Sequence, residues 1–359
     1  MAKALRKFGI SFAISTLILG IAALIIMSSI DDVLTGSFHK RDDELSEILN
    51  EDTEEAEKND PASAENALSS LDGDSFTVLA VLTDYRPDVY DDYLPDPEKE
   101  DDAKDEKPGM FINGYRKWGA ANICLLKCSK ETGSYVVVPI PPVTKVQTPA
   151  GASRIYDVLP DYGTEYFKTK IEALTGLKID KYAIMNCTEV TSFITQFGAV
   201  WCNVPCEIFT NGVEYLSSTG ATAAKVKNPG VSYTRMLEVC EDYIGPSSMG
   251  LLLFKDYTNG IDDEMTISAS YMRGCAANFK KFVEEGVLSA YWQTLKPYFK
   301  ETDIDENFLS SHNALIGAYS DEIVKTVNIV GMFKEIGEDG EPVFEIDKPR
   351  TVATLKNYR

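Results

Sequence analysis

Two charged side chains follow directly on the first apolar stretch after residue 75. Residues 76–82 are almost continuously apolar, which predicts a β-strand covered on both faces, and Asp84 and Arg86 stand at its carboxyl end. In α/β folds, ligands bind at that end of a strand. A carboxylate and a guanidinium placed there either hold the charged groups of a ligand or form an ion pair in a surface turn.

A second strand end carries prolines. The stretch SYVVVPIPPVTKV (134–146) begins as a strand, and Pro139, Pro141 and Pro142 follow it. Proline cannot donate to a β-ladder, so the sheet has to end here and the chain has to leave as a stiff extended loop. This loop is expected at the ligand-binding edge of the sheet, either as a working site or as the structural surround of one.

The seven cysteines and two histidines suggest no catalytic pair or zinc site. The cysteine spacing matches no zinc-binding pattern, His39 lies in an acidic stretch, and His312 follows no recognisable motif. Cys124 and Cys128 lie on one face of a predicted strand about 13 Å apart, which is too far for a disulfide. We expect the cysteines to be buried as small apolar side chains rather than to form a disulfide framework.

The amino terminus predicts a membrane anchor. Residues 8–30 carry no charge, three basic residues precede them, and Asp31 and Asp32 follow. A helix of this length, at about 1.5 Å per residue, crosses a bilayer with some tilt. The charges place residues 1–7 in the cytoplasm and the carboxyl-terminal domain outside the cell, at a single-pass position in the cell membrane. A cleaved signal peptide is the alternative, but the apolar run is long for one and lacks a clear cleavage site.

The acidic charge is concentrated in two stretches. Of the net charge of −21, residues 31–60 contribute −9 (12 acidic and 3 basic residues) and residues 91–107 contribute −6 (9 acidic and 3 basic). We interpret 31–75 as an acidic extracellular linker and about 88–112 as an exposed insertion in the folded domain. The chain has no basic patch, so nucleic-acid binding is disfavoured.

Strand and helix patterns alternate in the folded part of the chain. Strands are predicted at 122–128, 134–138, 177–187, 199–208 and 250–255, and helices at 164–175, 188–197, 232–244, 275–286, 287–299 and 306–319. This order predicts an α/β fold: a three-layer α/β/α sandwich with a mixed, mostly parallel sheet, preceded by one transmembrane helix. Asp339 and Gly340 lie between apolar runs and predict a closing hairpin.

The wording of several motifs resembles the LytR-CpsA-Psr (LCP) family of cell-envelope proteins. LTDYR (82–86) resembles the family's G-x-D-x-R, KETG (130–133) a K-x-T-G turn, and IPPVT (140–144) its I-P-x-x-T. The most specific part is LTGLKIDKYAIMNCTEVTSFITQFGAVWCNVP, a helix–strand–helix–strand of similar wording. The resemblance covers about residues 76–345 and leaves 346–359 as a carboxyl-terminal tail.

The resemblance implies a domain anchored outside the membrane that moves a glycopolymer from a polyprenyl-pyrophosphate carrier to peptidoglycan, using magnesium. It makes Asp84 a candidate metal ligand, and Asp84, Arg86 and Lys255 candidate catalytic residues. Carboxylates suit the metal, and arginines take up phosphate charge through bidentate contacts. Stabilising charge on the transferring phosphoryl group is most of the catalysis in such a reaction.

Several charged positions of the family pattern are altered. The Arg-Ser-Asp phrase before the second strand corresponds to Gly119, Ala120 and Ala121, and the Arg-Asp of I-P-R-D corresponds to Pro142 and Val143. Lys255 stands at the first arginine of Y-V-R-x-R, but a point charge does not replace a bidentate fork. The remaining candidates for phosphate or lipid contacts are Arg116, Lys145, Arg154 and Arg273, the last of which is alternatively a surface arginine.

Three functions follow from these observations. The chain is either a non-catalytic or weakly active LCP-like protein of cell-wall glycopolymer assembly, or a magnesium-dependent phosphotransferase with an altered site. In both, a polyprenyl-phosphate lipid or a cell-wall glycopolymer is the expected partner. The third possibility is an adhesion or sensor domain whose acidic insertion contacts a cation. The concerted loss of charged motif residues favours the first function.

Overall fold

The computed structural model describes residues 67–85, 119–210, 215–217, 232–254, 261–334 and 342–358. The predicted anchor, most of the acidic linker, the acidic insertion, and the site candidates Arg86, Arg116 and Lys255 lie outside these ranges. Within them, no helix is both long and apolar enough to cross a bilayer. The domain begins earlier than expected, because Leu68 is already buried in its core.

A mixed sheet of six strands lies at the centre of the described residues, in the order β12-β6-β1-β2-β3-β13. The β1–β6 and β3–β13 pairs are parallel, and the β1–β2, β2–β3 and β12–β6 pairs are antiparallel. The sheet is therefore mixed but not mostly parallel, because the short turn after β2 returns the chain directly as β3. The strands are β1 (Phe76–Thr83), β2 (Ala120–Ser129), β3 (Ser134–Pro139), β6 (Lys181–Asn186), β12 (Phe299–Thr302) and β13 (Val324–Thr326).

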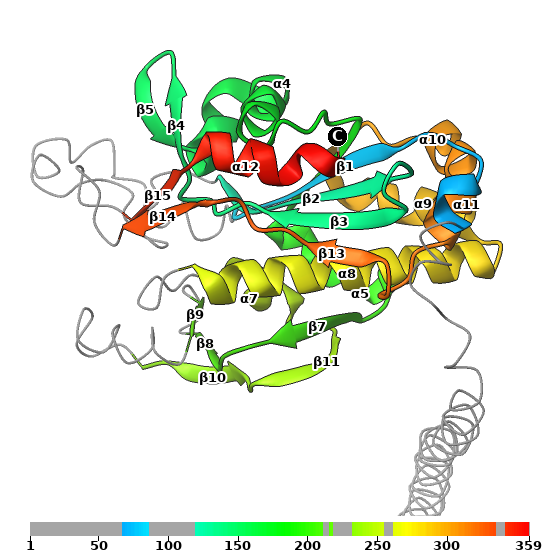
Figure 1. Ribbon diagram of the computed structural model, residues 1–359. Coiled ribbons are helices and arrows are strands. Elements are labelled where there is room, and N and C mark those ends of the chain that lie inside the picture. The colour runs from blue at the N-terminus through cyan, green and yellow to red at the C-terminus, as the bar shows by residue number, and fades with distance from the viewer. Residues whose placement is uncertain are drawn as a thin grey trace, which may run out of the picture. The chain divides into compact units, whose positions relative to one another are not determined.

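Helices cover both faces of this sheet (Figure 1). On one face α4 packs on β2, and α12 packs on α4; on the other, α7 and α8 contact β2 and α5 contacts α7. This arrangement agrees with the predicted helix–sheet–helix layering. The helices are α4 (Ile155–Thr175), α5 (Val190–Phe197), α7 (Ser248–Leu253), α8 (Asp262–Glu284), α9 (Leu288–Leu295), α10 (Glu306–Ser311), α11 (Asn313–Gly317) and α12 (Lys348–Leu355), with short 3-10 turns η2 (Cys187–Glu189), η3 (Lys296–Tyr298) and η4 (Lys356–Tyr358).

Short strand pairs complete the domain. β7 lies against α8, where the helix has a glycine at its closest point: a Cβ on Gly274 would come within 2.3 Å of the Trp201 carbonyl oxygen. The expected tail, 346–359, contains α12, which buries Leu355 against the domain. The short strands are β4 (Lys145–Thr148), β5 (Gly151–Arg154), β7 (Val200–Val204), β8 (Ile208–Thr210), β9 (Tyr215–Ser217), β10 (Thr234–Leu237), β11 (Cys240–Ile244), β14 (Gly331–Lys334) and β15 (Val343–Ile346).

Two predicted elements have the opposite secondary structure. Residues 232–244, predicted as a helix, form β10 and β11, which pair with β8 and β7. Residues 250–255 were predicted as a strand, but Ser248–Leu253 is helical. Each segment is short and its apolar spacing is ambiguous, so pairing and packing with distant residues decide its conformation.

Other boundaries agree more closely with the sequence pattern. The predicted helix over 164–175 is the second half of α4 and ends at Gly176, which has the left-handed conformation (φ 72°). The predicted 275–286 helix is the second half of α8, 287–299 divides into α9 and β12, and 306–319 divides into α10 and α11. The predicted closing hairpin is present as the antiparallel β14–β15 pair.

The seven cysteines all lie within the described ranges, where none of them forms a disulfide, and five of them are buried. Burial raises the pKa of the Cys124 and Cys275 thiols well above the ordinary range, and raises that of Cys128 to about 12. The expectation of small, buried apolar side chains is confirmed for these residues, whose thiols stay protonated at neutral pH.

We therefore predict that alkylation in denaturant without a reducing agent adds seven labels to the chain. In the native state Cys124 and Cys275 react slowly, because their thiols are buried and protonated. Intact-mass spectrometry counts the labels, and a parallel sample treated with a reducing agent is the control. Labels that appear only after reduction would show that disulfide bonds are present and would contradict the prediction.

Candidate functional site

Asp84 lies just beyond β1, after an irregularity in the β1–β2 register between Leu82 and Thr83. Its side chain is buried, with 3% of the residue exposed. Oδ1 accepts a hydrogen bond from the Gly119 backbone N–H at 2.8 Å, and Oδ2 accepts one from the Tyr156 hydroxyl at 2.6 Å. The carboxylate is thus fixed by the segment that enters β2 and by the first turn of α4.

The proline loop positions Tyr156. The Pro142 carbonyl accepts the Tyr156 N–H at 3.0 Å, and the Thr144 carbonyl accepts the Ile155 N–H at 2.8 Å. The loop itself is closed by Thr144, whose N–H and hydroxyl both donate to the Pro141 carbonyl. The predicted strand-end loop is therefore a buried support that anchors the start of α4.

Tyr156 also fills the space beside Gly119. A Cβ on Gly119 would lie 2.4 Å from the tyrosine ring, closer than real side-chain contacts allow. Ala120, Ala121 and Val143 are buried as well. The positions where the family pattern has charged residues thus hold small or apolar groups packed into the domain.

Three of the predicted cations are described, and each has a carboxylate partner. Lys145 is 4.0 Å from Glu345, Arg154 is 3.2 Å from Asp157, and Arg273 is 2.9 Å from Asp321. Lys145 and Arg154 face each other across the β4–β5 pair, which leads into α4 and Tyr156.

Arg273 is on α8, which packs on the sheet face opposite α4 (Figure 1). The structure therefore brings Lys145 and Arg154 together near the start of α4 and places Arg273 elsewhere.

The described residues do not assemble a magnesium site. In the ranges given above, no three cysteine, histidine or acidic residues come close enough to share a metal ion. Among the described residues, Asp84 is the carboxylate that directly follows β1, and both of its oxygens accept hydrogen bonds from groups of the protein. A magnesium ion requires several oxygen ligands in octahedral geometry, and one carboxylate held in this way does not provide them.

An apolar cavity of about 220 Å³ lies on the other face of the sheet, between the sheet and α8. It exists because three neighbouring strands place small side chains at one level: Cys124, Ala80 and Ala183 are cross-strand partners in β2, β1 and β6. Larger apolar side chains from α5, α8, α9 and α10 form the rest of the wall, including Phe193, Met272, Phe279, Trp292 and Phe308.

The cavity follows β1. Phe76, Val78, Ala80 and Leu82 all line it, so it extends over seven residues of the strand, or roughly 20 Å. One end reaches Leu82, two residues before Asp84. The polar atoms at this end include a buried pair, in which the Ser268 hydroxyl donates to the Asn122 side-chain oxygen at 2.7 Å. The cavity is therefore apolar along β1, with its polar lining atoms including this pair at the end nearer Asp84.

Comparison with known proteins gives matches in structure alone: no family model and no curated protein matches the sequence. The crystal structure of B. subtilis TagV covers 80% of this chain and 98% of its own, with a TM-score of 0.54 and 13% identity. The B. subtilis putative transcriptional regulator ywtF has a TM-score of 0.51 at 11% identity, covering 80% and 89%. A structure of TagT bound to LI-WTA has a TM-score of 0.50 at 12% identity, covering 84% and 93%.

TagV and TagT are LCP proteins, and the alignments include almost all of their chains. This chain has the LCP fold. At identities of 11–13%, the likeness concerns the fold and assigns no activity. Within the LCP fold, Gly119, Ala121, Pro142 and Val143 stand where the family pattern led us to expect charged groups.

Tyr156 was missed by sequence reasoning. It lies 72 residues from Asp84 in the chain, and no motif connects the two. The cavity was not located either, because apolar residues that line a cavity and those that fill a core have the same sequence pattern. The one available signal was the set of small residues in three adjacent strands, which becomes visible only when the strand register is known.

We predict that Gly119→Ala lowers the free energy of unfolding by about 1–3 kcal/mol, because the added methyl group overlaps the Tyr156 ring. Chemical denaturation measures the change. Gly245→Ala is the matched control, since a Cβ there meets no atom within 4 Å. The same Gly119 substitution in a Tyr156→Ala background should cost much less. Equal costs in both backgrounds would show that the two residues do not share this space.

Proposed function

We propose that the chain is a membrane-anchored, extracytoplasmic LCP-like protein that holds a polyprenyl-phosphate lipid and takes part in cell-wall glycopolymer assembly with little or no transferase activity. The observation that carries the proposal is an apolar cavity that ends two residues from Asp84, a buried carboxylate that accepts hydrogen bonds from the Gly119 N–H and the Tyr156 hydroxyl. The predicted single-pass anchor at 8–30, which would hold the domain outside the cell next to the membrane, supports contact with a membrane lipid.

The cavity is suited to the lipid part of such a ligand. Its walls consist almost wholly of aliphatic, aromatic and sulfur-containing side chains. The thiols of Cys124 and Cys275 are uncharged at neutral pH, because burial raises their pKa. Each methylene that moves from water into such walls contributes about 0.8 kcal/mol. An isoprenoid or similar chain is therefore bound by apolar contact along β1, with its phosphate toward the Asp84 end.

The groups around Asp84 support the low activity. Transfer of a phosphoryl group requires fixed positive charge where negative charge develops, and loss of one such donor costs roughly 100- to 1000-fold in rate. Gly119 and Val143 supply no charge at two positions where the family pattern has arginine or aspartate. The lack of charge at these two positions is consistent with a protein that binds the lipid carrier without transferring its glycopolymer.

The second candidate is a magnesium-dependent phosphotransferase with an altered site. It is favoured by the placement of Asp84 at the end of the cavity and by Lys145 and Arg154 on the hairpin that leads into α4. In this case the metal and phosphate contacts would involve Asp84, Arg86 and Lys255. The two candidates differ in turnover and share the lipid-binding step.

The first prediction is that a polyprenyl phosphate or pyrophosphate co-purifies with the full-length chain in detergent. Ala80→Phe should abolish it, because the ring fills the space that the small side chains of Ala80, Cys124 and Ala183 leave in the cavity. Ala152→Phe, in the exposed β5, makes the same change outside the cavity and should retain the lipid. Mass spectrometry of the extracted lipid is the readout, with thermal unfolding to check that each variant folds. Absence of lipid from the unchanged chain would refute the proposal.

The second prediction concerns turnover. With a lipid-linked glycopolymer, peptidoglycan and magnesium, we expect a rate at least about 100-fold below that of an active LCP enzyme assayed in parallel. Radiolabelled polymer transferred to the insoluble wall fraction measures the rate. Comparable turnover that requires magnesium and is lost in Asp84→Asn would favour the phosphotransferase instead.

A further inference from the structure

At the end of the cavity away from Asp84, one short segment lies against the start of β1, beside Tyr135 and Tyr319, which also line the cavity. Residues 303–311, which we call the plug, include α10 and contribute Ile304, Phe308 and Leu309 to the cavity wall. The Phe308 ring meets the Phe76 ring edge-on, with centroids 5.4 Å apart, and Phe76 is the first residue of β1. The plug is therefore where a chain lying along β1 would stop.

The strand register shows that the plug and Asp84 lie at opposite ends of β1. Lys181, which binds the plug, is level with Val78 in the parallel β1–β6 pair, whereas Met185 is level with Leu82. From Phe76 to Asp84 the strand advances by eight residues, or roughly 26 Å. Thus the two ends of the cavity have different surroundings: a carboxylate at one and an aromatic plug at the other.

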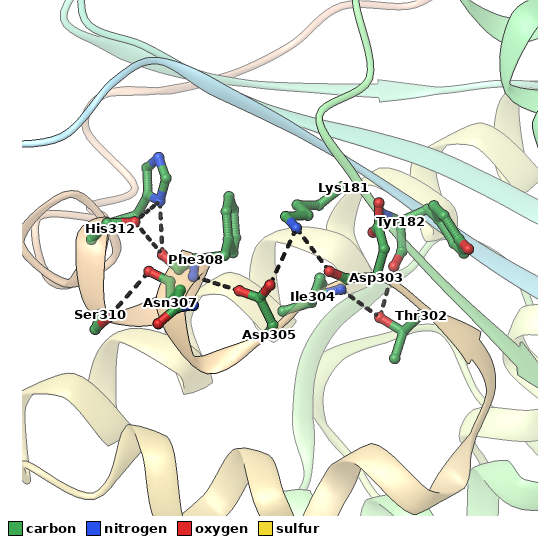
Figure 2. A network of polar contacts seen from close by, with 11 residues as sticks. Lys181, Tyr182, Thr302, Asp303, Ile304, Asp305, Asn307, Phe308, Ser310 and His312 are labelled. Atoms are coloured by element: carbon green, nitrogen blue, oxygen red, sulfur yellow. Dashed lines mark hydrogen bonds and ion pairs between the residues drawn. The ribbon is translucent and has the colours of Figure 1, made fainter.

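The plug is held in place by a small polar network around Lys181 (Figure 2). The Lys181 ammonium donates to the Asp303 carbonyl at 2.8 Å, lies 3.8 Å from the Asp305 carboxylate, and is 5.7 Å from the centre of the Phe308 ring. Asp303 in turn accepts the Tyr182 backbone N–H at 2.6 Å. These contacts fix the segment that precedes α10 to the start of β6.

Asp305 sets the orientation of α10. Its Oδ1 accepts the Phe308 N–H at 2.7 Å, as an N-cap, and this hydrogen bond holds the residue whose ring lines this end of the cavity. The hydrogen-bonded Phe308 N–H lowers the pKa of Asp305, so the carboxylate is charged beside Lys181 at neutral pH. At the other end of α10, His312 contacts the Phe308 carbonyl through Nδ1 at 2.7 Å.

The cavity volume makes the position of the plug important. At about 220 Å³ the cavity is smaller than the roughly 300–1000 Å³ of most small-molecule sites, and both of its side walls belong to the packed core. The plug residues Ile304, Phe308 and Leu309 belong to the same core cluster, but α10 is only six residues long and the segment before it is anchored by the polar contacts around Lys181. Displacing this short segment disrupts less packing than moving the sheet or α8 would. Additional length is therefore available chiefly at the plug.

We propose that the plug determines the length of lipid chain that the cavity accepts, with Phe308 and Leu309 as the specificity-determining residues. This inference rests on the proposed lipid-binding function. Chains that end at Phe76 are bound with the plug in place, and longer ones require its displacement, so shortening these two side chains shifts the preference toward longer isoprenoids.

The test is a competition between geranyl, farnesyl and geranylgeranyl pyrophosphate for the full-length chain in detergent, read by native mass spectrometry. Phe308→Ala should shift the ratio of longer to shorter bound probe by about tenfold. Phe299→Ala is the matched control: Phe299 also lines the cavity, but its strand partner Met185 is level with Leu82 at the Asp84 end. That variant should change binding of all three probes alike.

Three further variants keep the test decisive if Phe308→Ala does not fold. Leu309→Ala shortens the other plug side chain, and Asp305→Ala removes the cap and the ion pair, while Asp305→Asn keeps a cap. Leu309→Ala and Asp305→Ala should shift the ratio toward longer probes, and Asp305→Asn should shift it less. Probes that bind with an unchanged length ratio in every folded plug variant would overturn the plug inference alone. Failure of every probe to bind the unchanged chain would overturn the proposed function.

Discussion

A buried carboxylate must be given hydrogen-bond donors inside the fold, and the supply of donors to Asp84 organises this domain. One donor is a backbone N–H from the segment entering β2, and the other is the hydroxyl of Tyr156 on α4. Leaving either oxygen without a donor would cost about 1–3 kcal/mol or more. The irregularity at the end of β1, the proline loop and the start of α4 are all arranged around this one side chain.

This arrangement separates the two faces of the sheet by chemistry. On the α4 side, hydrogen bonds and close packing fix the end of β1. On the α8 side, small residues at one level of three strands leave an apolar space in an otherwise filled core. A single strand thus carries a polar anchor at its end and an apolar binding surface along its length, which is the combination that an amphiphilic ligand requires.

The sequence predicted the parts of the fold that depend on local pattern. The near-continuous apolar run of β1 and the glycine at the end of α4 are local signals, and both are in the structure. The sheet direction, the strands at 234–244 and the partner of Asp84 depend on contacts between distant residues, so no local pattern contained them. The position of Asp84 at the end of β1 was predicted because a charged residue directly after a buried strand is a local signal.

The contact between Gly119 and Tyr156 has a consequence for how this chain can evolve. At position 119 the family pattern expects an arginine, yet any side chain there meets the tyrosine ring. A single substitution at 119 therefore costs stability before it can add a useful charge, and removing the ring first takes a donor from Asp84. Whichever of the two residues changes first, the singly substituted protein is less stable than the present chain. The two residues therefore constrain each other, and a charged side chain at position 119 requires two coupled substitutions.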